Sequence, residues 1–165
     1  MKYLFTYLIS FSLFLISCSE NEDYSGNHEN YSINLNLALE TDWEMANNIN
    51  SLINIHRNNN GLPSLKVDKQ YASAYAVDHT LYMIRNNRIS HDNFNNRSAA
   101  LKERGANTVA ENVAFGYTSA EDVVRAWLNS PPHKKIIEGS YSHSGFGIMK
   151  NDKGHYFFTQ LFYDE

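Results

Sequence analysis

Three residues that can do chemistry are spread through the second half of the chain, each in a different local setting. His91 lies in a polar segment just after a predicted helix, and His133 comes directly after two prolines. Glu111 lies in an apolar run, where an extended strand would place its side chain on the same face as Val109 and Val113. Burying a carboxylate among valines is costly unless a cation or donor meets it. Glu111 is therefore either a charge on a wet face or a paired carboxylate in a cleft.

Two neutral imidazoles and a carboxylate are a ligand set that suits zinc. Because histidine titrates at about pH 6.5, metal binding by such a set should weaken as the pH falls. The same groups can also act as general acids and bases. Glu121 is a second candidate carboxylate, but the helix dipole also explains a glutamate in the first turn of a predicted helix.

Several other kinds of site are absent from the sequence. No nucleophile elbow, HExxH helix, phosphate-binding loop or dinucleotide-binding glycine motif occurs. Ser90 adjoins His91, but neighbours in an extended loop point to opposite sides, so this pair is not a nucleophile and its base. The single cysteine, Cys18, excludes an intramolecular disulfide and any two-cysteine metal or redox motif.

The N-terminus has the pattern of an export signal. A lysine at position 2 precedes an apolar run that is too short for a confident membrane span and has the form of a signal-peptide core. The run ends in Leu15-Ile16-Ser17-Cys18, which resembles a bacterial lipobox, in which the cysteine thiol is acylated. Residues 1–17 are therefore predicted to be a lipoprotein signal peptide removed before Cys18; the alternative is an uncleaved signal anchor.

The export signal places the remainder outside the cytoplasm, and its length and composition indicate one globular unit. Residues 18–40 are expected to form a lipidated N-terminus and tether, and residues 41–165 a single domain. The acidic stretch at 19–23 resembles the surface-export signal of some Gram-negative lipoproteins, which favours the outer membrane or cell surface of a bacterial envelope. A net charge of −4 argues against a nucleic-acid surface.

The periodicity of the domain predicts helices first and a hairpin last. A helix from Trp43 to Gly61 has Asp42 as a plausible cap, and Ser119 with Asp122 forms a capping box for another. This order indicates an α+β layered domain rather than a doubly wound parallel sheet. The other expected elements are helices at 68–87 and 98–104, an extended segment at 108–115, and hairpin strands at 144–150 and 155–163.

Five short segments follow one another along the domain: Ile55–Arg57 with Gly61–Leu65, Ser90-His91, Ala110–Ala114, Ala120–His133 and Gly145–Gly147. Taken in this order, they resemble the bacterial branch of the CAP superfamily, also called the SCP-like or allergen V5/PR-1 domain. The resemblance covers roughly residues 45–163 and implies a three-layer α-β-α sandwich with a central antiparallel sheet.

The resemblance also implies a cleft lined by two histidines and two acidic residues. His91 and His133 correspond to the histidines, and Glu111 to the first acid. Glu121 is the best match for the second acid, although many relatives carry that acid after the tryptophan, where this chain has Leu128-Asn129. A proline also replaces the glycine usual before the second histidine, and the disulfides of eukaryotic members are absent.

We therefore expect a lipid-anchored, extracytoplasmic CAP-domain protein. The favoured function is a non-enzymatic binding or interaction module whose cleft holds a divalent metal such as zinc. The alternatives are a metal-dependent hydrolase of peptides and a carrier of a sterol-like or fatty ligand, the last by family analogy alone. The expected partners are the membrane, through the lipid anchor, and an unidentified protein or lipid ligand.

Overall fold

The computed structural model describes residues 32–165, and the predicted signal peptide and Cys18 lie outside this range. Five α-helices, four strands and one 3-10 helix make up this part of the chain. In chain order they are η1 (Leu35–Glu40), α1 (Trp43–Asn59), β1 (Lys66–Val67), α2 (Tyr71–Arg85), α3 (Phe94–Lys102), β2 (Val109–Phe115), α4 (Ala120–Asn129), α5 (Pro131–Ile137), β3 (His143–Lys150) and β4 (Tyr156–Tyr163).

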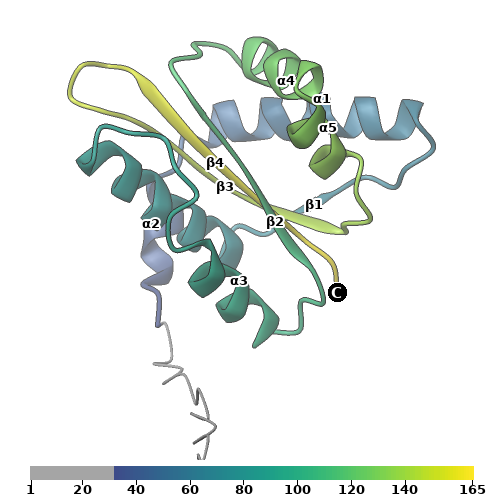
Figure 1. Cartoon of the computed structure of the whole chain (residues 1–165), viewed down its shortest axis with the longest axis horizontal. Helices are drawn as coiled ribbons and strands as arrows, with labels where there is room; N and C mark the ends of the chain where they lie inside the picture. Colours follow the sequence, from purple (N-terminus) through teal and green to yellow (C-terminus); the bar gives the residue numbers. More distant parts are fainter. Residues whose placement is uncertain (1–31) are drawn as a thin grey trace, which may run out of the picture.

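The four strands form one sheet in the order β1-β3-β4-β2, so β2 is an edge strand. Helices α1, α4 and α5 cover one face and α2 and α3 cover the other, which confirms the α-β-α sandwich (Figure 1). β2, β4 and β3 are antiparallel as expected, whereas the short β1 runs parallel to β3. The sheet is therefore mixed. β1 and β3 can be parallel because they are not joined by a hairpin: several helices and β2 lie between them in the chain.

Each face of the sheet has its own core, because successive residues of a strand point to opposite faces. The core under α1, α4 and α5 contains Phe146, Phe158 and Trp127, and the core under α2 and α3 contains Tyr75 and Leu161. All five side chains are at most 2% exposed. Their burial supplies the main driving force that fixes both helical layers on the sheet.

Helix α2 lies unusually close to β3. A Cβ atom at Gly147 would come within 2.3 Å of the backbone of Ala76, and one at Gly145 within 2.4 Å of the backbone of Ala72. Only glycine fits at these two positions, and the close contact fixes α2, and with it the segment that follows α2.

The predicted helix starts are confirmed at two positions. The Asp42 carboxylate accepts from the backbone N–H of Met45, and the Ser119 hydroxyl accepts from the backbone N–H of Asp122. Asp68, expected to be the first residue of the second helix, lies before it and accepts from the N–H of Ala72. These bonds satisfy N–H groups that the first helical turn leaves without a partner.

Two elements differ from the expectation. The prolines at 131 and 132 follow the end of α4 at Asn129, as expected, but they are also the first residues of α5, where proline needs no N–H partner. η1, expected to belong to the tether, is folded onto the domain: Ala38 is 2% exposed and its carbonyl accepts from the indole N–H of Trp43. The compact part of the chain therefore begins before Thr41.

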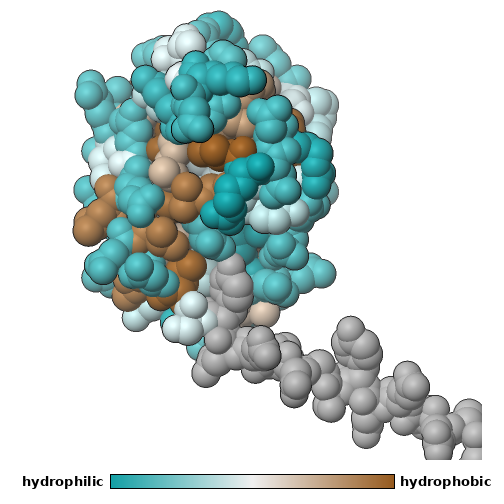
Figure 2. Space-filling view, turned by 90° about the vertical axis from the view of Figure 1, so that its left-hand side faces the viewer, coloured by the Kyte–Doolittle hydropathy of each residue, from teal (hydrophilic) through white to brown (hydrophobic). Residues whose placement is uncertain are grey.

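Apolar side chains are gathered on the side of the domain that carries η1, the C-terminal end of α2 and the β3–β4 turn (Figure 2). On this side the side chain of Leu39 in η1 is 76% exposed.

Candidate functional site

The candidate site is built on the edge strand β2. Glu111 and Asn112 are consecutive residues of this strand, so their side chains leave opposite faces of the sheet. Glu111 pairs in register with Leu161 and faces the α2–α3 layer, while Asn112 pairs with Gln160 and faces α5. One short segment thus contacts both helical layers.

Glu111 is buried and paired with Arg97 of α3. Arg97 Nε lies 2.9 Å from Oε2 and its Nη2 lies 2.9 Å from Oε1, a two-pronged ion pair. Glu111 is 5% exposed and Arg97 is 3% exposed. The carboxylate that the sequence places among valines therefore has its cation, which removes most of the cost of burying it.

The same carboxylate holds His91. The Nδ1 of His91 lies 2.8 Å from Oε1 of Glu111, and because a carboxylate accepts, Nδ1 carries the proton. The His91 side chain is 53% exposed. Within residues 32–165 its Nε2 makes no hydrogen bond, so the outer edge of the ring is open to a ligand.

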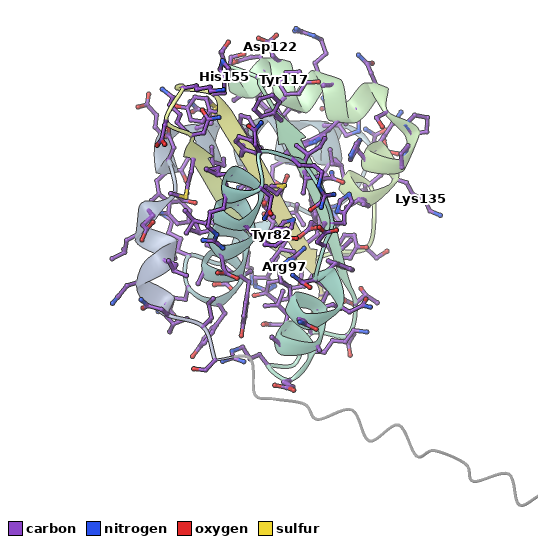
Figure 3. All side chains as sticks on the ribbon, turned by 60° about the vertical axis from the view of Figure 1, so that its left-hand side comes forward. Tyr82, Arg97, Tyr117, Asp122, Lys135 and His155 are labelled. Carbon is purple, nitrogen blue, oxygen red and sulfur yellow. The ribbon has the colours of Figure 1, made fainter. Side chains whose placement is uncertain are left out.

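The segment that carries His91 is fixed from both neighbouring helices. His79 of α2 donates from Nε2 to the carbonyl of Ser90 at 2.7 Å, and Arg97 donates to the carbonyl of Asp92 at 2.8 Å. Tyr82 donates to the Asp92 carboxylate at 2.9 Å. Tyr82 and Arg97, labelled in Figure 3, thus both donate to Asp92, one from α2 and the other from α3. Burial lowers the pKa of His79, so this histidine is neutral near pH 7.

His133, in the first turn of α5, lies on the other side of β2. Its Nδ1 is 2.8 Å from the hydroxyl of Ser130, and its backbone carbonyl accepts from the amide of Asn112 at 3.3 Å. Burial lowers the pKa of His133, and a charge on His91 would lower it further. The two histidines are held by Glu111 and Asn112, adjacent residues of β2, although they belong to elements on opposite faces of the sheet.

The far end of α5 is held by a buried arginine of α1. Arg57 is fully buried and donates to the carbonyls of Ile137 and Gly139 at 2.7 and 2.9 Å. It also donates to the carbonyl of Tyr141 at 3.0 Å. Ile137 is the last residue of α5, where carbonyls lack helical partners, and Gly139 and Tyr141 lie in the turn that follows it. Lys135 on the same helix points outward (Figure 3).

Glu121, the fourth predicted residue, is not brought to this cluster. It lies in the first turn of α4 and lines a surface depression with Asp42 and Asn48 of the α1 region. His91, Glu111 and His133 do not line that depression. The structure thus brings together three of the four predicted residues.

His91 and His133 are the residues of this cluster that could hold a metal ion. In the described part of the chain, no group of three or more histidine, cysteine, aspartate or glutamate side chains is arranged to hold a metal ion. His91 and His133, however, each engage Nδ1 with an oxygen partner, which is how proteins orient histidines that ligate metals through Nε2. Both oxygens of Glu111 are occupied, so its position suits orienting His91 rather than binding metal directly.

Two residues of the site, Arg97 and Asn112, do not stand out in the sequence. Arg97 lies in the polar stretch Asn95–Ser98 and has no periodic signal, but a buried carboxylate at Glu111 demands a cation, and this demand is the signal that points to one. Asn112 is implied by strand alternation, which turns it to the opposite face from Glu111.

Comparisons with known proteins agree with this architecture. Residues 51–162 match the sequence profile of the Cysteine-rich secretory protein family, CAP. Two curated relatives come from Bacillus subtilis: the uncharacterized membrane protein YlbC, 31% identical over 118 residues, and the uncharacterized protein YkwD, 30% identical over 105 residues. These matches cover 67% and 61% of this chain but only 32% and 40% of the relatives.

Solved structures give the same result. An outer surface protein from Borrelia burgdorferi has a TM-score of 0.66 and 26% identity, over 74% of this chain and 93% of that one. An extracellular protein containing a SCP domain from Bacillus anthracis has a TM-score of 0.63 and 28% identity, over 76% of this chain and 44% of that one.

The profile match, together with the sandwich and the two histidines around β2, shows that the chain belongs to the CAP family. Its relatives include proteins described as outer-surface and extracellular. Across residues 32–165, none of the helices is both long enough and apolar enough to cross a bilayer.

Proposed function

We propose that this chain is a lipid-anchored CAP-domain protein of the bacterial envelope that acts as a binding module through His91 and His133. The observation that carries the binding site is that each histidine has its Nδ1 fixed by an oxygen partner, at 2.8 Å in both cases. Both rings are thereby oriented before any ligand arrives, which lowers the entropic cost of binding.

A divalent metal ion such as zinc is the ligand that this donor set favours. His91 and His133 would hold it through Nε2, with Glu111 behind His91 and Ser130 behind His133. A bound zinc ion would supply a Lewis acid with open positions for an oxygen or nitrogen group of a partner. With only two imidazoles from the chain, those open positions remain available to water or to the partner.

The contacts of Ser130 do not match those of the nucleophile in a serine hydrolase. In serine hydrolases the nucleophile meets Nε2 of the histidine and an acid meets Nδ1. Here the hydroxyl of Ser130 meets Nδ1 of His133, and in the described residues no carboxylate contacts Nε2 of that ring. The hydroxyl therefore orients the ring and is not activated as a nucleophile.

An NMR titration of zinc into the wild-type protein tests the binding site. We expect the Nε2 resonances of His91 and His133 to move together and to saturate at one equivalent, because one ion contacts both rings. His155, which contacts Phe115 at the β3–β4 turn, is the control and should not move. Movement of one ring without the other would contradict a shared site.

Variants of the two histidines separate the two alternative functions. A metal-dependent hydrolase predicts that His91→Ala abolishes turnover of peptide substrates in a folded protein. A carrier of sterol-like or fatty ligands predicts ligand transfer that persists when both His91 and His133 are replaced. A binding module predicts neither turnover nor transfer, and loss of partner binding in both single variants.

The lipid anchor rests on the segment Leu15-Ile16-Ser17-Cys18 after an apolar run, and on relatives described as outer-surface and extracellular. Acyl chains on one cysteine bind a bilayer strongly, because each buried methylene contributes about 0.8 kcal/mol. We expect Cys18→Ser to abolish incorporation of labelled palmitate and to move the protein out of the membrane fraction. Ser19→Ala is the matched control and should behave as wild type. An unlabelled wild-type protein would contradict the anchor.

A further inference from the structure

Two buried amide side chains lie between the sheet and α5. Asn112 of β2 and Gln160 of β4 are directly opposite each other in the antiparallel pair, so both point to the α5 face. Both residues are 0% exposed. Their surroundings are apolar: Phe146 lies opposite Gln160 on β3, and Phe158 and Phe162 flank Gln160 along β4.

These amides are not satisfied by the protein. In the described part of the chain, Oδ1 of Asn112 and both Oε1 and Nε2 of Gln160 have no hydrogen-bond partner. The remaining polar atom, Nδ2 of Asn112, makes only a 3.3 Å bond to the carbonyl of His133. Buried amide groups in proteins almost always have a hydrogen-bond partner. Three neighbouring amide atoms without a protein partner in one apolar layer therefore indicate a bound ligand that hydrogen-bonds to them.

We infer that Asn112 and Gln160 bind buried water between the sheet and the start of α5. One water molecule there can accept from Nε2 of Gln160 and donate to Oδ1 of Asn112, and its second hydrogen or a second water can meet Oε1 of Gln160. The ligand is water rather than an ion, because the site offers both donors and acceptors. A charged group would moreover lie among phenylalanines without a counter-charge.

The hydrated amides fix the position of His133. The first turn of α5 has no side-chain cap, because the hydroxyl of Ser130 is engaged with the ring of His133. The bond from Asn112 to the His133 carbonyl is therefore a direct tie between the sheet and this turn. Gln160, through the water, holds the Asn112 amide in the orientation that makes this bond, and so acts as a positioning residue. This inference does not depend on metal binding.

Detection of the water in the wild-type protein is the first test. In a crystal structure at about 1.5 Å resolution, we expect one or two ordered waters within hydrogen-bond distance, about 3.2 Å, of the Asn112 and Gln160 amides. Magnetization transfer from a long-lived water to the amide protons of Gln160 is the matching NMR signal. Direct bonding of the two amides to each other, with no water between them, would overturn the inference.

Substitution of Gln160 tests its consequence for α5. Gln160→Met keeps the side-chain volume and removes the amide, so we expect Tm to fall by about 4 °C. Amide hydrogen exchange in α5 should become about ten-fold faster, and the ring resonances of His133, but not those of His91, should shift. Ser144→Ala is the control, since Ser144 is also buried with an unpartnered hydroxyl on the same face of the sheet, but it is opposite Phe162 and Val67 rather than Asn112. A stabilised Gln160→Met protein, or equal effects in both variants, would contradict the positioning role.

Discussion

Glu111 and Asn112, adjacent in β2, each hold one of the two site histidines from opposite faces of the sheet. The Glu111 carboxylate accepts from the ring of His91 at 2.8 Å, and the Asn112 amide donates to the carbonyl of His133 at 3.3 Å. The alternation of side chains along a strand is therefore what brings an α2–α3 histidine and an α5 histidine together over one edge.

The Arg97–Glu111 pair should contribute strongly to stability. Arg97→Met leaves a buried carboxylate that contacts only the rings of His91, at 2.8 Å, and His79, at 3.8 Å, among the described residues, so we expect the free energy of unfolding to fall by about 3–5 kcal/mol. Urea denaturation measures this change. The double variant Arg97→Met/Glu111→Leu removes both charges and should be more stable than Arg97→Met alone. A single variant as stable as wild type would show that the pair contributes little.

Arg57 of α1 should contribute strongly to the stability of α5, although it lies outside that helix. Arg57→Met leaves carbonyls of Pro63, Ile137, Gly139 and Tyr141 without their donor, and we expect a loss of about 3 kcal/mol. The matched control is Arg125→Met, because Arg125 is exposed and pairs only with Asp122 on the surface. That variant should change the unfolding free energy by less than about 0.5 kcal/mol. Equal losses in both variants would contradict a special role for Arg57.

The two glutamates should differ in their effect on the metal site. Glu111→Gln weakens the hold on the His91 ring, so we expect zinc affinity to fall by about 10–100-fold, the usual cost of losing a partner behind a ligand. Glu121→Gln should leave zinc affinity unchanged, because Glu121 lies beside Asn48 in the depression between α4 and α1. Competition with a fluorescent zinc chelator measures both. A strong effect of Glu121→Gln would place the second acid in the site after all.

Stability should decrease as the pH falls from about 7.5 to 5. Burial lowers the pKa of both His79 and His133, and His91 lowers that of His133 further. The unfolded chain, with a histidine pKa of about 6.5, then binds more protons than the folded one across this range. The contribution is fully present above about pH 6.5 and is lost as the pH falls towards the folded pKa values.

Variants distinguish the contribution of these histidines to the pH dependence of stability from that of other residues. Urea unfolding at pH 7.5 and 5 should show a smaller difference for His133→Gln than for wild type. His155→Gln, at the exposed β3–β4 turn, is the control and should keep the wild-type difference. Stability that is independent of pH in the wild-type protein would contradict the burial of neutral histidines.

Much of the fold follows from local sequence signals. The caps at Asp42 and Ser119 and the hairpin around Gly154 depend on neighbours in the chain, so a pattern of residues predicts them. α5 was not predicted, because Pro131 ends one helix and begins the next, and sequence spacing alone does not separate the two roles. η1 was missed because its helical turn is stabilised by packing on α2.

The site was predictable only in part for a related reason. His91, Glu111 and His133 carry chemical groups that single them out in the sequence. The roles of Arg97 and Asn112 depend on contacts with residues distant in the sequence. Arg97, for example, is 14 residues away from the carboxylate that it neutralises. Glu121 lines a depression with Asp42 and Asn48, and its local pattern does not reveal this, because a helix-start glutamate looks the same whether or not it faces a site.

The most direct test of a shared His91–His133 site is calorimetric titration of zinc into wild type and the two single variants. Each histidine supplies one ligand, so we predict one-to-one binding in wild type and loss of measurable binding in both His91→Ala and His133→Ala. Circular dichroism confirms that the variants are folded. Affinity should also weaken as the pH falls, since the ligands must be neutral. Wild-type affinity in either variant, or no saturable binding in wild type, would contradict the account.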